Sequence, residues 1–108
     1  MNKETFLSKG VKARKVHIKT LNETVNIRPL SYNAFVELSK CEDVVQEALI
    51  ITSFGLLNDD GTRMFSESEI QTLGESMEYA TITEIASEIT SISLIGSNNL
   101  VKQLANSL

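Results

Sequence analysis

Cysteine, histidine, tryptophan and proline are all scarce in this chain of 108 residues. There is one cysteine, Cys41, one histidine, His17, one proline and no tryptophan. A single cysteine excludes an intramolecular disulfide framework and any multi-cysteine zinc site. A single histidine excludes paired-histidine metal motifs and argues against acid–base catalysis by histidine. The five glycines stand apart from one another, so no phosphate-cradling loop is present.

Long apolar runs are also absent. Glu4 interrupts residues 1–8, so we expect no signal peptide, and no stretch approaches the roughly 18 apolar residues of a membrane span. With 42% hydrophobic and 22% charged residues, the composition is that of a folded chain. We therefore expect one small soluble domain over residues 13–108, preceded by a flexible lead-in over residues 1–12.

Charge of the two signs is unevenly distributed along the chain. Residues 1–28 carry seven cationic and two acidic side chains, whereas residues 29–108 carry three cationic and twelve acidic ones. A cationic arm on an acidic body could bind nucleic acid or dock on the acidic face of a neighbouring copy. The arm has no RNA-binding signature and Phe6 as its one aromatic residue, which favours simple solvated charge.

Apolar and polar residues alternate in two stretches near the N-terminus. Val16 and Ile18 alternate with lysine and histidine, and Val25 and Ile27 alternate with polar residues after a short turn at residues 21–23. This pattern predicts a β-hairpin over about 14–28 with one apolar face, which must pack on the helices that follow.

Helical signals dominate the rest of the chain. The spacing of apolar residues predicts helices over about 32–39, 42–56, 67–73 and 77–95, and a last short segment could form a helix over 99–107. The predicted fold class is α+β, mainly α: an N-terminal hairpin followed by a bundle of four to five short-to-medium helices.

Caps define several of the predicted helix ends. Ser31 is expected to cap the first helix, and Ser66 and Glu69 form a capping box, with Phe65 and Ile70 at the flanking staple positions. Gly74 is a natural terminator for the helix over 67–73, and Ser76 can cap the last long helix.

Two helices have apolar stripes that we expect to face the core. In the helix over 42–56 the stripe consists of Val44, Val45, Ala48, Leu49 and Thr52. In the helix over 77–95, four isoleucines and Ala86 share one face at helical spacing, which outweighs a composition of Ile, Ser and Thr that favours strands. The four are Ile82, Ile85, Ile89 and Ile92.

No constellation for catalysis, a cofactor or a metal stands out. Residues 56–67 resemble a calcium loop at Asp60 and Gly61, but Leu56 occupies the position of its first oxygen ligand. Glu84 and Glu88 share a helical face without a third acid or histidine, which indicates a solvated surface. The chain is therefore interpreted as a non-enzyme.

The order of these pieces resembles a known family. The segments that carry the likeness are VNIRPLS (25–31) before the first helix, NDDGTRMFSESEI (58–70) and LGE (73–75) before the long helix. Together they resemble the small tail assembly chaperones of long-tailed (siphovirus-like) bacteriophages, over about three quarters of the chain. The first helix departs from the family pattern, since SYNA (31–34) stands where a glycine and an acid–base pair are common.

The resemblance implies a chaperone of tail morphogenesis in the host bacterial cytoplasm. Such proteins coat the tape-measure protein, recruit major tail (tube) protein subunits and are absent from the finished particle. Helix-in-groove packing would carry this recognition, and we expect apolar residues off the isoleucine stripe to bind protein: Met77, Tyr79, Leu94 and Ile95.

Self-association is expected from the same surface and from the segregated charge. Two alternatives stay open at this point: a small nucleic-acid-associated regulator that uses the basic arm, and a structural head–tail component.

Overall fold

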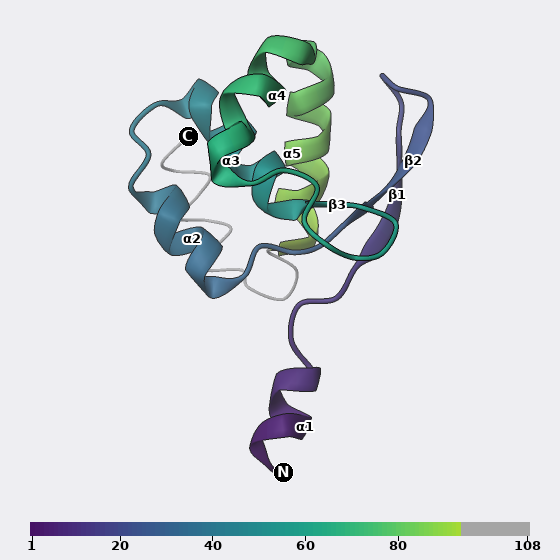
Figure 1. Ribbon diagram of the computed structural model, residues 1–108, viewed down its shortest axis with the longest axis vertical. Coiled ribbons are helices and arrows are strands. Elements are labelled where there is room, and N and C mark those ends of the chain that lie inside the picture. Colours follow the sequence, from purple (N-terminus) through teal and green to yellow (C-terminus); the bar gives the residue numbers. More distant parts are fainter. Residues whose placement is uncertain (94–108) are drawn as a thin grey trace.

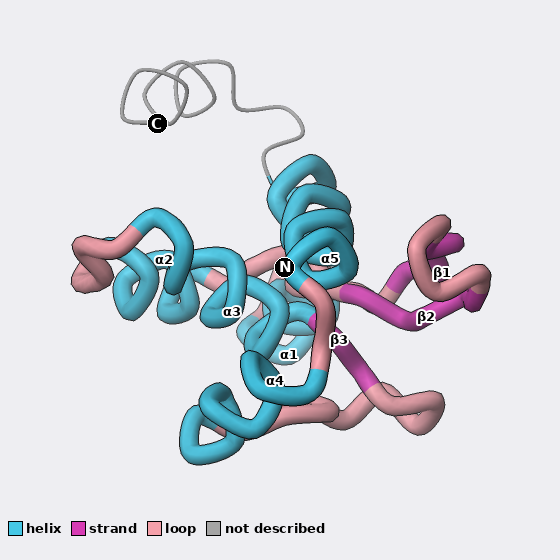
Figure 2. Tube along the Cα trace, turned by 90° about the horizontal axis from the view of Figure 1, so that it is seen from above, coloured by secondary structure: helices cyan, strands magenta, loops and turns pink. Residues whose placement is uncertain are grey.

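The computed structural model describes residues 1–93, and its helices and strands are shown in Figure 1. The elements in chain order are α1 (Lys3–Ser8), β1 (Arg14–Ile18), β2 (Glu23–Ile27), α2 (Tyr32–Ser39), α3 (Val44–Gly55), β3 (Leu56–Leu57), the 3-10 turn η1 (Glu67–Glu69), α4 (Ile70–Ser76) and α5 (Tyr79–Ser93). Figure 2 shows α5 between the strands on one side and α2 and α3 on the other. The fold is α+β and mainly α, as the sequence predicts.

The predicted hairpin is formed by β1 and β2. The strands pair antiparallel with Val16 opposite Val25, and Asn22 takes the left-handed conformation (φ 51°) that closes the turn. Ile18 and Ile27 are fully buried on the apolar face and join the core cluster that contains Ile85 and Ile89 of α5. The expectation that the hairpin packs on later helices is confirmed.

A third strand, β3, extends the hairpin into a sheet of order β1-β2-β3. Leu56 pairs with Ile27 and Leu57 with Asn26, both antiparallel, and both leucines are buried. The helix predicted over 42–56 therefore ends one residue earlier, at Gly55, whose carbonyl accepts a hydrogen bond from the Arg28 N–H. A strand of two residues has no alternation for a sequence pattern to detect.

At several helix starts, a side-chain oxygen accepts a hydrogen bond from a backbone N–H group that has no partner within the helix. The Ser31 hydroxyl accepts from the Ala34 N–H, as predicted, and the Asp43 carboxylate accepts from the Val45 N–H. The predicted capping box is also present, and within it the Glu69 carboxylate accepts from the Ser66 N–H at 3.0 Å. The box opens η1, which continues into α4.

Small residues allow α3 and α5 to approach closely. The buried residues of α3 are Thr52, Ser53 and Gly55, all in its second half. A Cβ at Gly55 would stand 2.5 Å from the Ile89 Cδ1 atom. The predicted stripe is thus wrong at Val44 and Val45, which are 60% and 61% exposed, because only the second half of α3 is buried.

The isoleucine stripe of α5 is helical, as predicted, and it is buried except at Ile92, which is half-buried. Ile82, Ile85, Ala86 and Ile89 face the core. Three hydroxyl groups of this Ser- and Thr-rich helix donate to carbonyls one turn earlier: Thr90 to Ala86 at 2.8 Å, Ser93 to Ile89 at 2.6 Å, and Thr83 to Tyr79. Burial of the isoleucines against the core explains why a segment with strand-like composition is helical.

Further helix boundaries differ from the predictions, including the starts of α3 at Val44 and of α5 at Tyr79. Residues 3–8, expected to be an aperiodic lead-in, form α1, which is capped by the Asn2 side chain. Gly74 lies inside α4 instead of ending it, and Ser76 is the last residue of α4 instead of the cap of α5. A glycine at this position leaves room for α3, because a Cβ there would stand 3.1 Å from the Leu49 Cδ1 atom. The segment over 99–107 lies outside the described residues.

Candidate functional site

Apolar side chains, of which Val45 and Tyr79 are exposed, gather where the start of α3 meets the α4–α5 junction. They line a hollow of about 180 Å³, which we call the α3–α5 groove. Its lining residues are Val45, Ala48, Leu49, Gly74, Met77, Tyr79 and Ile82. Two of the predicted binding residues, Met77 and Tyr79, thus lie together in the groove. The other two, Leu94 and Ile95, are outside the residues that the structure describes.

The junction between α4 and α5 positions the upper wall of this groove. The Met77 N–H donates to the Leu73 carbonyl at 3.2 Å, which closes the last turn of α4. Met77 itself is extended (φ −115°, ψ 146°), so the chain turns there before α5 begins at Tyr79. Met77 is half-buried and Tyr79 is 69% exposed. The Met77 side chain therefore forms part of the wall of the groove, and the Tyr79 side chain forms part of its rim.

Gly74 and Leu49 set the depth of the groove. The absence of a side chain at Gly74 brings α4 against Leu49 of α3, as the 3.1 Å approach of a hypothetical Cβ shows. Val45, one turn before Leu49, is left uncovered beside them. Sequence periodicity placed Val45 in the core, so the partner of the predicted residues Met77 and Tyr79 was missed.

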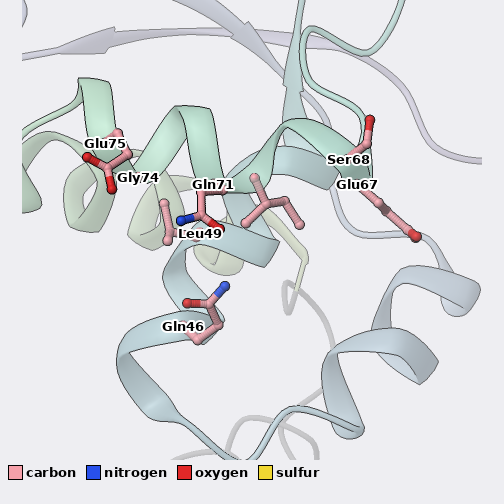
Figure 3. Close-up of a pocket in the computed structure, with 8 residues that line it drawn as sticks. Gln46, Leu49, Glu67, Ser68, Gln71, Gly74 and Glu75 are labelled. Carbon is pink, nitrogen blue, oxygen red and sulfur yellow. The ribbon is translucent and has the colours of Figure 1, made fainter.

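A larger polar hollow continues from the groove between α3, η1 and α4 (Figure 3). It has a volume of about 640 Å³ and shares Leu49 and Gly74 with the groove. Gln46 of α3 and Gln71 of α4 point into the space between the two helices, with Glu67 and Glu75 at its ends. The α3–α5 groove thus has an apolar floor and opens into the polar hollow, which has a glutamate at each end.

The charge around this surface is of one sign. The two stretches that build it, residues 42–49 and 66–82, contain no lysine or arginine. They contain seven acidic residues: Glu42, Asp43, Glu47, Glu67, Glu69, Glu75 and Glu78. We call these seven residues the acidic rim; of them, Glu67 and Glu75 line the polar hollow, and charge of this sign favours cationic partners and repels acidic ones.

The turn at residues 58–62, within the segment that resembles a calcium loop, is held by hydrogen bonds of its own. The Asp60 carboxylate accepts from the Thr62 hydroxyl at 2.6 Å and from the Thr62 N–H at 2.9 Å. These bonds, chiefly that from the Thr62 side chain, lower the pKa of Asp60. Gly61 takes the left-handed conformation (φ 88°) that the turn requires. Within residues 1–93 no group of three or more His, Cys, Asp or Glu side chains could hold a metal ion.

The lone cysteine and histidine lie on different elements. Cys41 is half-buried between α2 and α3, and its thiol donates to the Asp43 carbonyl at 3.3 Å. His17 lies on the exposed face of β1, opposite Thr24 of β2. The structure does not bring these two residues into a pair. Among the helices of residues 1–93, none is both long and apolar enough to cross a membrane.

Glu84 has a role that the sequence did not indicate. Its carboxylate accepts hydrogen bonds from the Lys19 N–H at 2.6 Å and the Thr20 N–H at 3.0 Å, which ties α5 to the hairpin turn. These two backbone donors lower the pKa of Glu84. The Glu84 carboxylate stays at the surface, as predicted, but the sequence could not indicate these hydrogen bonds because the partners are more than 60 residues away.

Two arginines, also missed, cap the C-terminus of α3. Arg28 Nε donates to the Phe54 carbonyl at 3.0 Å, and Arg63 Nε donates to the Ser53 carbonyl at 2.7 Å. The Arg63 guanidinium lies 4.3 Å from the centre of the Phe54 ring, and burial lowers its pKa. Cations at a helix C-terminus are stabilising, so these residues have a structural task and are not part of a free basic patch.

Comparison with solved structures finds this fold in the tail assembly chaperone of bacteriophage HK97. The two structures superpose with a TM-score of 0.65 over 82% of this chain and 94% of that one, with 13% sequence identity. No family model and no curated protein matches the sequence. The likeness confirms the fold implied by the segments at residues 25–31, 58–70 and 73–75.

Proposed function

We propose that this protein is a tail assembly chaperone of a long-tailed bacteriophage and acts in the host bacterial cytoplasm. The observation that carries the proposal is the fold shared with the HK97 tail assembly chaperone over 82% of the chain. In this proposal the protein binds the tape-measure protein, recruits tail-tube subunits and performs no catalysis. The order of turns and caps in the sequence supports the same family independently of the structure comparison.

The α3–α5 groove is the proposed site for the tape-measure protein. Its lining is apolar at Val45, Leu49 and Met77, and the exposed ring of Tyr79 extends it toward solvent. A long helical client presents apolar side chains at intervals of three and four residues, and a groove of this kind takes such anchors. Covering the client's apolar stripe would prevent its aggregation before the tube is built.

Co-expression with the tape-measure protein encoded in the same genome tests this function. We expect the tape-measure protein to be soluble and to co-purify with the chain, and to be insoluble when expressed without it. Tyr79→Asp should abolish this effect, because a carboxylate would enter the apolar groove. Tyr32→Asp is the matched control, since Tyr32 is 84% exposed on α2 and does not line the groove. Equal solubility of the tape-measure protein with and without the chain would refute the proposal.

Purified phage particles distinguish an assembly factor from a structural component. We expect the chain to be absent from finished tails and present in lysates that accumulate unassembled intermediates. A stoichiometric band in purified particles would favour the head–tail component instead.

A further inference from the structure

The helix α1 has apolar side chains but no surface to cover them. None of its residues is buried, and Phe6 and Leu7 are 67% and 65% exposed. Figure 1 shows α1 projecting away from the rest of the molecule, connected to β1 by residues 9–13. An isolated helix of six residues is not stable in water, so the capped arm needs a partner surface to remain helical.

The charge on this arm is the opposite of that around the α3–α5 groove. Residues 1–13 carry Lys3, Lys9 and Lys12 against the single acid Glu4. The stretches that build the groove carry seven acids and no cation. An apolar pair flanked by lysines thus complements an apolar floor with an acidic rim, both in side-chain type and in charge.

The position of the arm disfavours binding to the groove of its own chain. The arm enters the fold at Arg14, which pairs with Ile27, while Leu30 N–H donates to the hydroxyl of Ser93 at the end of α5. The groove lies at the other end of α5, beside Tyr79. The 15 residues of α5 span about 22 Å at 1.5 Å per residue, whereas the linker over 9–13 reaches at most about 17 Å. The arm can therefore reach the α3–α5 groove of a neighbouring molecule but not the groove of its own chain.

We propose that the α1 arm of one copy docks in the α3–α5 groove of a second copy. Phe6 and Leu7 fill the apolar floor beside Leu49 and Met77, and the lysines of the arm face the acidic rim. Because arm and groove are different surfaces of the same chain, the contact is head-to-tail and propagates into a ring or an open filament. Such a contact between copies of this chain requires no tape-measure protein.

Sedimentation of the purified full chain across a dilution series tests the contact in the absence of any tape-measure protein. We expect concentration-dependent assembly that weakens as salt is added, since screening reduces the attraction between rim and arm. The arm variant Phe6→Asp/Leu7→Asp should raise the dissociation constant at least about tenfold. Both residues are exposed, so the fold should be unaffected, and circular dichroism checks this.

Mixing two defective variants separates a head-to-tail contact from any symmetric one. The arm variant retains its groove, and Tyr79→Asp retains its arm, so the mixture can form one intact junction. We expect each variant alone to be a monomer of 11.9 kDa and the mixture to be a one-to-one dimer that grows no further. The control Tyr32→Asp should assemble like the parent chain. Assembly of the arm variant at parent concentrations, or a mixture that remains monomeric, would overturn the proposal.

A labelled peptide of residues 1–13 provides a second measurement that does not rely on the groove variant's folding. We expect the peptide to bind the arm variant, as measured by fluorescence anisotropy, and to bind more weakly at high salt. Absence of binding at any concentration at which the parent chain assembles would also refute the arm–groove contact.

Discussion

The Glu84 carboxylate of α5 accepts a hydrogen bond from the Lys19 N–H, 2.6 Å away in the hairpin turn. A second bond from the Thr20 N–H, at 3.0 Å, makes the contact a clamp between the helix and the hairpin. Hydrogen bonding to the ionised form lowers the pKa of Glu84 from its ordinary value of 4.5. The hairpin turn is thus tied to α5 by a carboxylate whose ionised form these bonds favour.

The clamp should make stability depend on acid pH. Because the folded-state pKa of Glu84 is depressed, its contribution is present above the unfolded value near 4.5 and is lost as the pH falls through the folded value. Urea denaturation between pH 6 and pH 3 should show a smaller loss of stability for Glu84→Gln than for the parent chain. Glu88→Gln, one turn later on α5, is the control and should retain the parent's pH profile. Identical profiles for the parent and Glu84→Gln would show that the clamp does not contribute.

Gly55→Ala should destabilise the fold by about 2 kcal/mol through overpacking. A Cβ at this position would stand 2.5 to 2.8 Å from three carbon atoms of the Ile89 side chain, which is itself fully buried. Chemical denaturation measures the loss, and adding Ile89→Val should recover part of it. Gly74→Ala is the comparison, because its Cβ would meet a flexible Leu49 methyl group at 3.1 Å and the helix gains propensity. An equal loss for both glycines would contradict the packing described for α3 and α5.

The capping box should contribute to the stability of η1 and α4. Replacing Ser66 with alanine removes the cap and should cost about 1 kcal/mol, whereas Ser87→Ala at an exposed position of α5 should cost nothing. Phe65→Ala should cost about 2 kcal/mol, because this ring is half-buried and packs against the core cluster. An unchanged denaturation midpoint for both Phe65→Ala and Ser66→Ala would contradict the contact.

Calcium should not stabilise the protein. Asp60 already accepts two hydrogen bonds from Thr62, and the buried, apolar Leu56 stands where a calcium loop needs its first ligand. Thermal unfolding in millimolar calcium and in EDTA should give the same melting temperature. A rise of several degrees that EDTA reverses would show a site that the loop geometry does not indicate.

The α1 arm and the tape-measure protein should compete, because both are proposed to occupy the α3–α5 groove. The arm variant Phe6→Asp/Leu7→Asp should then bind immobilised tape-measure protein more tightly than the parent chain does, measured as retained protein at equal input. Val11→Asp is a control for added negative charge, since Val11 is exposed and precedes β1 outside the helical part of the arm. Weaker binding by the arm variant would mean that the arm itself contacts the client.

The sequence alone determined the features whose partners are close along the chain. The Ser31 cap, the Ser66–Glu69 box and the positive φ angles at Asn22 and Gly61 each depend on groups no more than four residues apart. The hairpin alternation and the isoleucine stripe of α5 are likewise periodic over one element. Such features can be predicted from the sequence because the residues that form each contact are neighbours along the chain.

Only the tertiary structure decided which apolar residues meet and which remain uncovered. Periodicity cannot show that the buried positions of α3 lie in its second half, which leaves Val45 beside Met77 and Tyr79 in a groove. It also cannot show that Gly74 continues a helix in order to admit Leu49, or that Glu84 serves a turn 65 residues away. Burial and long-range hydrogen bonds depend on how whole elements pack, so the physical basis of the candidate site exists in the fold and not in any one segment.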